Sequence, residues 1–275
     1  MVFVTKFDGR RQPFDKSKII NTCLRLHASL EQAQAVANKI EKEVYDGIPT
    51  KKILKMIFTY LKDFKPELKH RIDLREAISR LRPKPDFEIF VALLLKEYGY
   101  SVQTNLLVPG KCITHEVDAI AIRGTETFFV EVKHHFQPHT YTGVDVMLET
   151  QARLEDLKEG FKLGRHGYNF SKALVICNTK FSDHALIYAE CKGIDYIGWK
   201  APADAGLEDM IEEKKLYPIT LLKNLDFKTE QKLGDAGIVT IKQLLEEDVD
   251  ELQRKTGISK KKLKLIIRNA REIYS

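Results

Sequence analysis

The sequence predicts a multi-domain α/β protein, because proline breaks and changes of pattern divide it into blocks of different character. Pro83 and Pro85 interrupt the chain, and the acidic, helix-like segment 201–218 closes at Pro218 and is predicted to be a linker. The blocks are an α+β domain with a β-hairpin and helices (1–82), an α/β domain with a mixed sheet (86–200), and an all-α domain (219–275).

Composition bounds the class of protein. The chain has 275 residues, 43% of them hydrophobic, which suits two or three folded domains. Its net charge of +6 is compatible with a nucleic-acid partner but does not demand one. No apolar stretch approaches the roughly 20 residues of a membrane span, so no membrane partner is expected. The four cysteines are scattered without metal-binding spacing, which favours a reduced, cytoplasmic protein.

The first block begins with a short strand, turns at Asp8-Gly9 and returns through Gln12-Pro13-Phe14. Asp15 or Ser17 can cap a helix that starts near Lys18. Further helices are predicted over residues 30–45, 50–62 and 73–81. Gly47 ends one helix and Thr50 caps the next.

This order of elements resembles the ATP-cone, the adenine-nucleotide-sensing module of ribonucleotide reductases. The matching residues are Val4-x-Lys6-x-Asp8-Gly9, Phe14-Asp15-x-x-Lys18-Ile19, Gly47-Ile48-x-Thr50 and Leu81-Arg82. The resemblance implies that ATP or dATP binds as an allosteric ligand. The implied contacts are Val4, Lys6, Gln12, Asp15, Lys18 and Thr50.

The chemistry of these residues suits a nucleotide. Lys6 and Lys18 can meet phosphates as point charges, and the backbone of Thr50 lies at a helix N-terminus, which favours anions. Leu54 stands where reductase cones often carry a histidine, which bears on the choice of nucleotide. No Walker-type loop is present, so binding without hydrolysis is expected. The alternative is a module that only packs or dimerises.

The second block predicts alternating helices and strands. Apolar residues repeat at helical spacing over residues 86–98, and Glu88 lies at the edge of that stripe. Glu88 is either a first-turn acid that favours the helix dipole or a third carboxylate of a site. The elements that follow are strands at 101–107, 115–122 and 127–133, a helix at 144–162, a buried strand at 173–177, a helix at 183–191 and a strand at 194–199.

The hairpin at the centre of this block carries a constellation of charges. If Gly124-Thr125 form a two-residue loop, Arg123 pairs with Glu126, and counting back sets Asp118 opposite Glu131. Directly opposed residues share a face with Cβ atoms about 5 Å apart, and the period of two adds Lys133. Two carboxylates at such a short distance repel each other unless a cation lies between them, so a hard divalent ion is expected.

The same residues have a non-functional interpretation, since an acid-x-Lys triplet usually marks a solvent-exposed strand face. The apolar run Phe128-Phe129-Val130 leads directly into Glu131, so this strand is predicted to be buried on both faces. Charges at the end of such a strand are paired or functional.

With Glu88, Asp118 and Glu131-x-Lys133, the block resembles the PD-(D/E)xK nuclease superfamily, nearest to Mrr-type restriction endonucleases and archaeal Holliday-junction resolvases. Val117 replaces the proline in the superfamily's name.

The resemblance to these nucleases implies a role for each residue of the motif. Asp118, Glu131 and the Val132 carbonyl are implied ligands of Mg²⁺ or Mn²⁺, and Glu88 supports the metal directly or through water. Lys133 positions or deprotonates the attacking water, and Gln151 orients Lys133 or the phosphate. The nearby His134, His135 and His139 are expected to be exposed loop histidines rather than metal ligands.

The third block contains an internal repeat. Ala-Gly-Ile at 236–238 and Thr-Gly-Ile at 256–258 each separate two helical segments, about 20 residues apart. The repeat resembles a tandem helix-hairpin-helix, as in the N-terminal domain of archaeal RecA-like recombinases. Such hairpins offer backbone N–H groups to phosphates without reading bases. The implied DNA contacts are Gly237, Gly257, Lys260, Lys261, Lys262 and Lys264. The alternative is a protein-docking helical domain with a solvated lysine face.

Together these observations predict a metal-dependent DNA endonuclease regulated by ATP or dATP. Duplex cutting needs two sites, which favours a homodimer. The enzyme alternative is a repair or recombination nuclease selective for branched DNA. The non-enzyme alternative is a nucleotide-responsive DNA-binding protein with an idle core, against which the complete set of site residues argues.

Overall fold

The computed structural model describes residues 2–65, 68 and 71–274. The chain forms two compact units, one up to Arg71 and one from Ile72 onward. Helix α4 (Leu74–Arg80), which the sequence placed in the first block, belongs to the second unit. In the described part of the chain, no helix combines the length and apolar character needed to cross a membrane.

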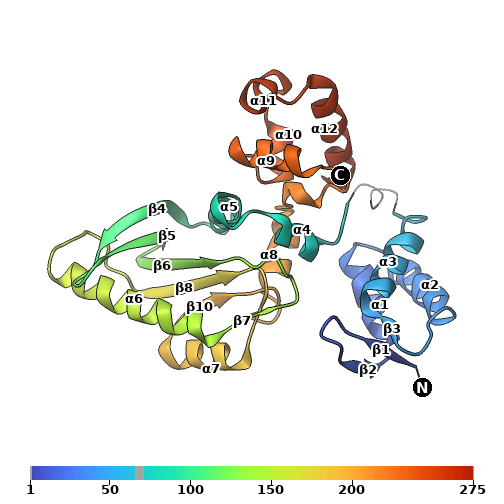
Figure 1. The fold of residues 1–275 in the computed structure, drawn as a ribbon, viewed down its shortest axis with the longest axis horizontal. Coiled ribbons are helices and arrows are strands. Elements are labelled where there is room, and N and C mark those ends of the chain that lie inside the picture. The colour runs from blue at the N-terminus through green and yellow to red at the C-terminus, as the bar shows by residue number, and fades with distance from the viewer. Residues whose placement is uncertain (1, 66–67, 69–70, 275) are drawn as a thin grey trace. The chain divides into compact units, whose positions relative to one another are not determined.

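The first unit packs three helices against a small sheet (Figure 1). Strand β1 (Phe3–Thr5) pairs antiparallel with β2 (Arg11–Pro13) and parallel with β3 (Ile48–Pro49). The helices are α1 (Lys16–Arg25), α2 (Leu30–Glu41) and α3 (Thr50–Leu61). Asp15 caps α1 as predicted, because its carboxylate accepts from the Ser17 N–H. The unit is α+β, as the sequence predicted.

The second unit is built on a five-stranded mixed sheet in the order β10-β8-β6-β5-β4. Strands β4, β5 and β6 are antiparallel, whereas β6, β8 and β10 are parallel. Their bounds are β4 (Ser101–Pro109), β5 (Thr114–Arg123), β6 (Glu126–Lys133), β8 (Lys172–Cys177) and β10 (Asp195–Ile197). A separate parallel pair joins β7 (Tyr141–Thr142) to β9 (Lys180–Phe181).

Helices cover both faces of this sheet (Figure 1). Helix α5 (Glu88–Glu97), reached from α4 through the short turn η2 (Pro83–Phe87), covers one face, where Phe90 packs with Ala119 and Val130. Helices α6 (Val144–Lys162) and α7 (Asp183–Lys192) cover the other, where Leu157 packs with Phe129.

At one point along β4 and β5, the side chains that face α5 and those that face α6 change places. Along β5, Ala119 packs on the α5 side but Val117 packs on the α6 side, although regular alternation would give both the same face. The β4–β5 ladder omits Asn105 and Asp118 at this point, and Asn105 has a positive φ of 55°. The strands therefore turn over beside Asp118.

The apolar core on the α5 side continues beyond the sheet into the C-terminal helices. These are α8 (Leu207–Lys214), the short η3 (Ile219–Leu221), α9 (Phe227–Asp235), α10 (Ile241–Glu246), α11 (Val249–Thr256) and α12 (Lys260–Tyr274). The Thr220 hydroxyl donates to the Ala77 carbonyl over 2.6 Å, and the Ile72 N–H donates to the Leu221 carbonyl over 2.9 Å. The C-terminal block is all-α, and it shares its core with α5.

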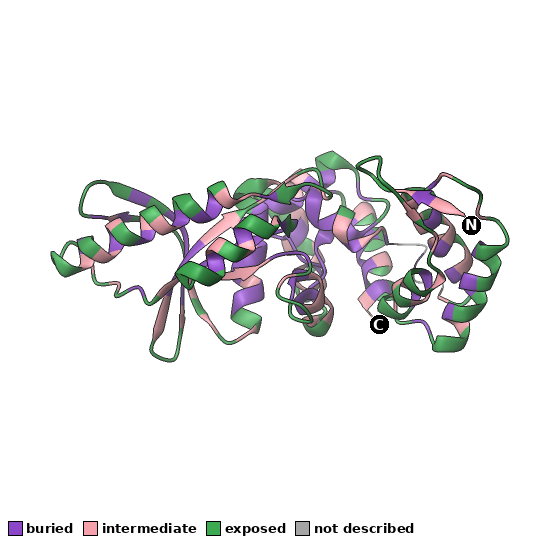
Figure 2. Ribbon diagram, turned by 90° about the horizontal axis from the view of Figure 1, so that it is seen from below, coloured by how far each residue is buried: buried purple, intermediate pink, exposed green. Residues whose placement is uncertain are grey.

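The segment 201–218 differs from the expected linker. It contains α8, and Leu207 and Ile211 on that helix have no exposed surface. Buried residues run along the helices as well as the strands (Figure 2). The many acidic residues on the outer face of α8 conceal this apolar stripe in the sequence.

Replacing Ile211 by alanine is expected to destabilise the second unit by about 2–5 kcal/mol, because a fully buried side chain leaves a cavity. Chemical denaturation followed by circular dichroism measures the change. Ile187→Ala on α7 is the matched control, since that isoleucine is 63% exposed and its loss should change stability by less than about 0.5 kcal/mol. Equal effects of the two variants would show that α8 is a loosely held connector.

Candidate functional site

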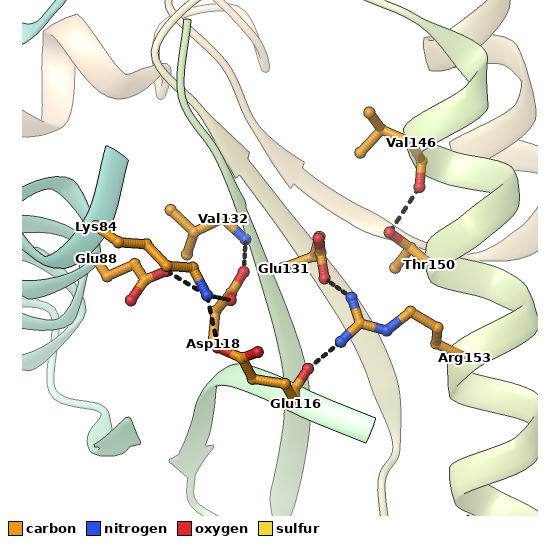
Figure 3. Close-up of polar contacts among 9 residues, drawn as sticks. All are labelled: Lys84, Glu88, Glu116, Asp118, Glu131, Val132, Val146, Thr150 and Arg153. Carbon is orange, nitrogen blue, oxygen red and sulfur yellow. Dashed lines mark hydrogen bonds and ion pairs between the residues drawn. The ribbon is translucent and has the colours of Figure 1, made fainter. Parts of the chain in front are cut away.

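The central hairpin has the predicted register. Arg123 pairs with Glu126, and the ladder runs back to Ala119 and Val130, one step before Asp118 and Glu131. The turn-over beside Asp118 changes the predicted geometry at that step. Asp118 Oδ2 accepts from the Val132 N–H at 2.8 Å, while Glu131 points to α6 and forms an ion pair with Arg153 (Figure 3). The two carboxylates are neighbours, but they contact different partners.

A lysine outside the predicted set of site residues lies among three carboxylates. Lys84 Nζ lies 2.8 Å from Glu116 Oε1, 3.2 Å from Glu88 Oε1 and 3.5 Å from Asp118 Oδ1 (Figure 3). Glu116 was also missed, as was Arg153, whose guanidinium additionally donates to the Glu116 carbonyl. The spacing of four residues between Lys84 and Glu88 was the available signal, concealed between Pro83 and Pro85.

The electrostatics of the site are those of crowded carboxylates. Burial, together with the charge of Asp118, raises the pKa of Glu131 to about 7, although Arg153 and Lys133 oppose the shift. Burial and the charge of Asp118 also raise the pKa of Glu88. The hydrogen bond to Glu116 raises the pKa of Lys84, so its ammonium stays charged. Burial is thus the main cause of both raised pKa values, and the neighbouring carboxylate of Asp118 adds to it.

The residues fit a hard divalent cation by the chemistry of their donors. Glu88, Asp118 and Glu131 supply carboxylate oxygens, the ligands that Mg²⁺ and Mn²⁺ prefer, and Glu88 and Asp118 are buried. Within residues 2–65, 68 and 71–274, no three or more His, Cys, Asp or Glu side chains are already arranged around a common metal position. Binding would require the ammonium or the guanidinium to move.

The two remaining predicted catalytic residues occupy different environments. Lys133 ends β6, is exposed, and lies close enough to Glu131 to lower the pKa of that carboxyl. Gln151 on α6 donates to Glu155 Oε1 at 2.7 Å, whereas its own side-chain oxygen is buried with no hydrogen-bond partner among the described residues. The structure thus places Lys133 beside Glu131, and it directs the Gln151 amide to its own helix rather than to Lys133.

The segment after Lys133 is fixed by a buried asparagine. Asn178, 1% exposed, accepts from the His135 N–H and donates to the His135 carbonyl, both at 2.8 Å. These side-chain bonds lie just beyond Lys133 and Cys177, the last pair of the β6–β8 ladder. The expectation of exposed histidines is wrong for His134 and His135, whose side chains are half-buried and whose pKa values are lowered by burial.

Replacing Asn178 by leucine is expected to cost about 1–3 kcal/mol of stability, because it leaves the His135 N–H and carbonyl buried without partners. The same replacement should accelerate hydrogen exchange of the His135 amide. Asn224→Leu is the control, since Asn224 is exposed. Unchanged exchange at His135 would show that other contacts hold this segment.

The first unit contains a cavity of about 200 Å³ between its sheet and its helices. Of the six predicted nucleotide contacts, Val4, Gln12, Asp15, Lys18 and Thr50 line this cavity. Lys6 is absent from its lining. Leu54 lines it among other apolar side chains, so an aliphatic wall stands where reductase cones often carry a histidine.

The predicted DNA contacts of the C-terminal block are only partly available. Gly237 and Gly257 have φ values of 76° and 62° and lie in the turns between paired helices. Lys260 forms an ion pair with Asp250, and Lys262 forms one with Asp226, both at 2.5 Å. Lys261 and Lys264 are exposed. Carboxylates of the same block thus neutralise part of the expected basic face.

Comparison with known protein families agrees with this architecture. Residues 2–79 match the ATP cone domain, residues 80–200 match the restriction endonuclease domain, and residues 217–274 match the AF1548-like C-terminal domain. The protein is therefore of the class that joins an ATP cone to a restriction endonuclease-type domain, as both resemblances predicted.

Individual relatives define the family more closely. An uncharacterized protein of Archaeoglobus fulgidus is 36% identical over 183 residues, which cover 66% of this chain and 99% of the relative. The crystal structure of a protein of unknown function, AF1548, is also 36% identical and superposes with a TM-score of 0.59 over 68% of this chain and 96% of that one. The chain belongs to the AF1548-like family.

A further relative matches a shorter part of the chain. The transcriptional repressor NrdR of Caldicellulosiruptor saccharolyticus is 36% identical over 69 residues, which are 22% of this chain and 45% of the repressor.

Proposed function

We propose that this protein is a metal-dependent DNA endonuclease whose activity responds to ATP or dATP at its cone. The observation that carries the proposal is the gathering of Glu88, Asp118 and Glu131 at the point where β5 and β6 lose their pairing, with Lys133 on the same strand. This cluster lies in the domain that matches restriction endonucleases.

Each residue of the site would have its own role in catalysis. Asp118 and Glu131 would hold Mg²⁺ or Mn²⁺ with the Val132 carbonyl, and Glu88 would support the ion directly or through water. The bound ion supplies Lewis acidity to the phosphate and a lowered pKa to its water. Lys133, exposed beside Glu131, can donate to a phosphate oxygen or orient the attacking water.

Exposed charge supports a nucleic-acid substrate. Lys261 and Lys264 lie in the first turns of α12, beside the turn at Gly257, where a backbone contact to phosphate would also fall. Lysines there would add binding that weakens with salt through release of counterions. Duplex and branched DNA both offer this chemistry, and a homodimer would supply the two sites that duplex cutting needs.

A second candidate is a nucleotide-responsive DNA-binding protein that does not cleave. It is favoured by the ion pairs that Lys84 and Arg153 already make with Asp118 and Glu131. The likeness of the cone to part of a transcriptional repressor points the same way.

Glu131→Gln should abolish cleavage of DNA, and Lys133→Met should lower its rate by about 100-fold or more. The assay offers linear duplex, single strand, flap and four-way junction with Mg²⁺ or Mn²⁺. Preference for the junction would identify a repair or recombination enzyme, and preference for linear duplex would identify a restriction-type enzyme.

The matched control for that assay is Glu126→Gln, which removes a carboxylate at the hairpin turn of the same sheet and should leave the rate unchanged. Wild-type protein that binds every DNA but cuts none would contradict the endonuclease proposal and support the regulatory protein.

Lys18→Ala should weaken binding of ATP and dATP about tenfold, because it removes a charged hydrogen-bond donor from the cavity. Lys6→Ala removes an equal charge outside the cavity lining and should change the affinity by less than about twofold. Isothermal titration calorimetry measures both. A larger loss of affinity with Lys6→Ala than with Lys18→Ala would indicate that the phosphates lie near Lys6 rather than near Lys18.

A further inference from the structure

One ammonium joins carboxylates from two elements of the candidate site. Lys84 lies in η2, the turn that leads into α5, and its Nζ contacts Glu88 at the start of α5 and both Glu116 and Asp118 on β5. All three distances are between 2.8 and 3.5 Å (Figure 3). The helix and the strand therefore meet through a shared cation.

Two of the three carboxylates are buried, whereas the lysine is largely exposed. Glu88 and Asp118 are 5% and 8% exposed, whereas the side chain of Lys84 is 55% exposed. A lysine is a point charge on a flexible stem, so its ammonium can withdraw to solvent while the buried acids stay in place. Arg153 differs, because its side chain is only 18% exposed and its guanidinium bonds both Glu131 and the Glu116 carbonyl.

Without a cation, the two buried carboxylates would repel each other at high cost. A divalent ion placed among the same oxygens would supply more charge than the ammonium, and two cations would not share that position without repulsion.

We propose that Lys84 is the internal counter-ion of the metal site, holding Glu88 and Asp118 together in the metal-free protein and withdrawing when a divalent ion binds. This inference rests on the proposed function, because it assumes that these carboxylates hold the metal. It assigns Lys84 the role of a positioning residue that competes with the metal.

The role has a signature that an ordinary ion pair lacks. Removing Lys84 should destabilise the metal-free protein, since the carboxylates lose their cation. The same change should strengthen metal binding, since the metal no longer displaces an ammonium. A lysine that served only to hold the fold would lower stability without tightening metal binding.

The test is Mn²⁺ binding by isothermal titration calorimetry and thermal unfolding with and without Mn²⁺, on the full chain. Lys84→Met should bind Mn²⁺ at least about fivefold more tightly than wild type, while its metal-free unfolding midpoint falls. Lys84→Arg, which keeps the charge, should return both values toward wild type. Lys111→Met is the matched control, because Lys111 has similar exposure and pairs with Glu159 at 2.8 Å, away from the site.

Equal or weaker Mn²⁺ binding by Lys84→Met than by wild type would overturn the role of Lys84 and leave the metal site standing. Absence of Mn²⁺ binding in both proteins would overturn this inference together with the metal site. Glu131→Gln separates these outcomes, because it should weaken Mn²⁺ binding whether or not Lys84 competes.

Discussion

The continuous apolar core on the α5 side of the sheet is the constraint on which the rest of the second unit depends. It fixes α5 against β5 and β6, and thereby places Glu88 beside Asp118. The same core runs through α8 into the C-terminal helices, so a charged site and a helical block are held by one hydrophobic body. Ion pairs with Lys84 and Arg153 lower the electrostatic cost of placing Glu88, Asp118 and Glu131 in this sheet.

Much of this could be predicted from the sequence, because some signals are local. A two-residue turn at Gly124-Thr125 determines the pairing of Arg123 with Glu126, and counting from it locates Asp118 and Glu131 correctly along their strands. The likeness to the ATP cone and to restriction endonucleases, which short motifs of the sequence predicted, is likewise confirmed.

The predictions that failed concern contacts between residues far apart in the sequence. The exchange of faces at Asn105 and Asp118 depends on a positive φ in the neighbouring strand, which no pattern along β5 reveals. Arg153 approaches Glu131 from a helix 22 positions later in the chain. The buried face of α8 was masked by acidic neighbours, and carboxylates distant in sequence neutralise Lys260 and Lys262. Such partners become visible only when the elements pack.

The shared core between the sheet and the C-terminal helices has a geometrical consequence. Two parts that share one core keep a similar separation, so under the proposed function a nucleic acid held by the turns near Gly237 and Gly257 would meet Glu131 at a set number of nucleotides from the point of attachment. Such an arrangement would measure length along its ligand. Its selectivity would then come from whether the ligand can bend or branch at that distance, and not from recognition of individual bases.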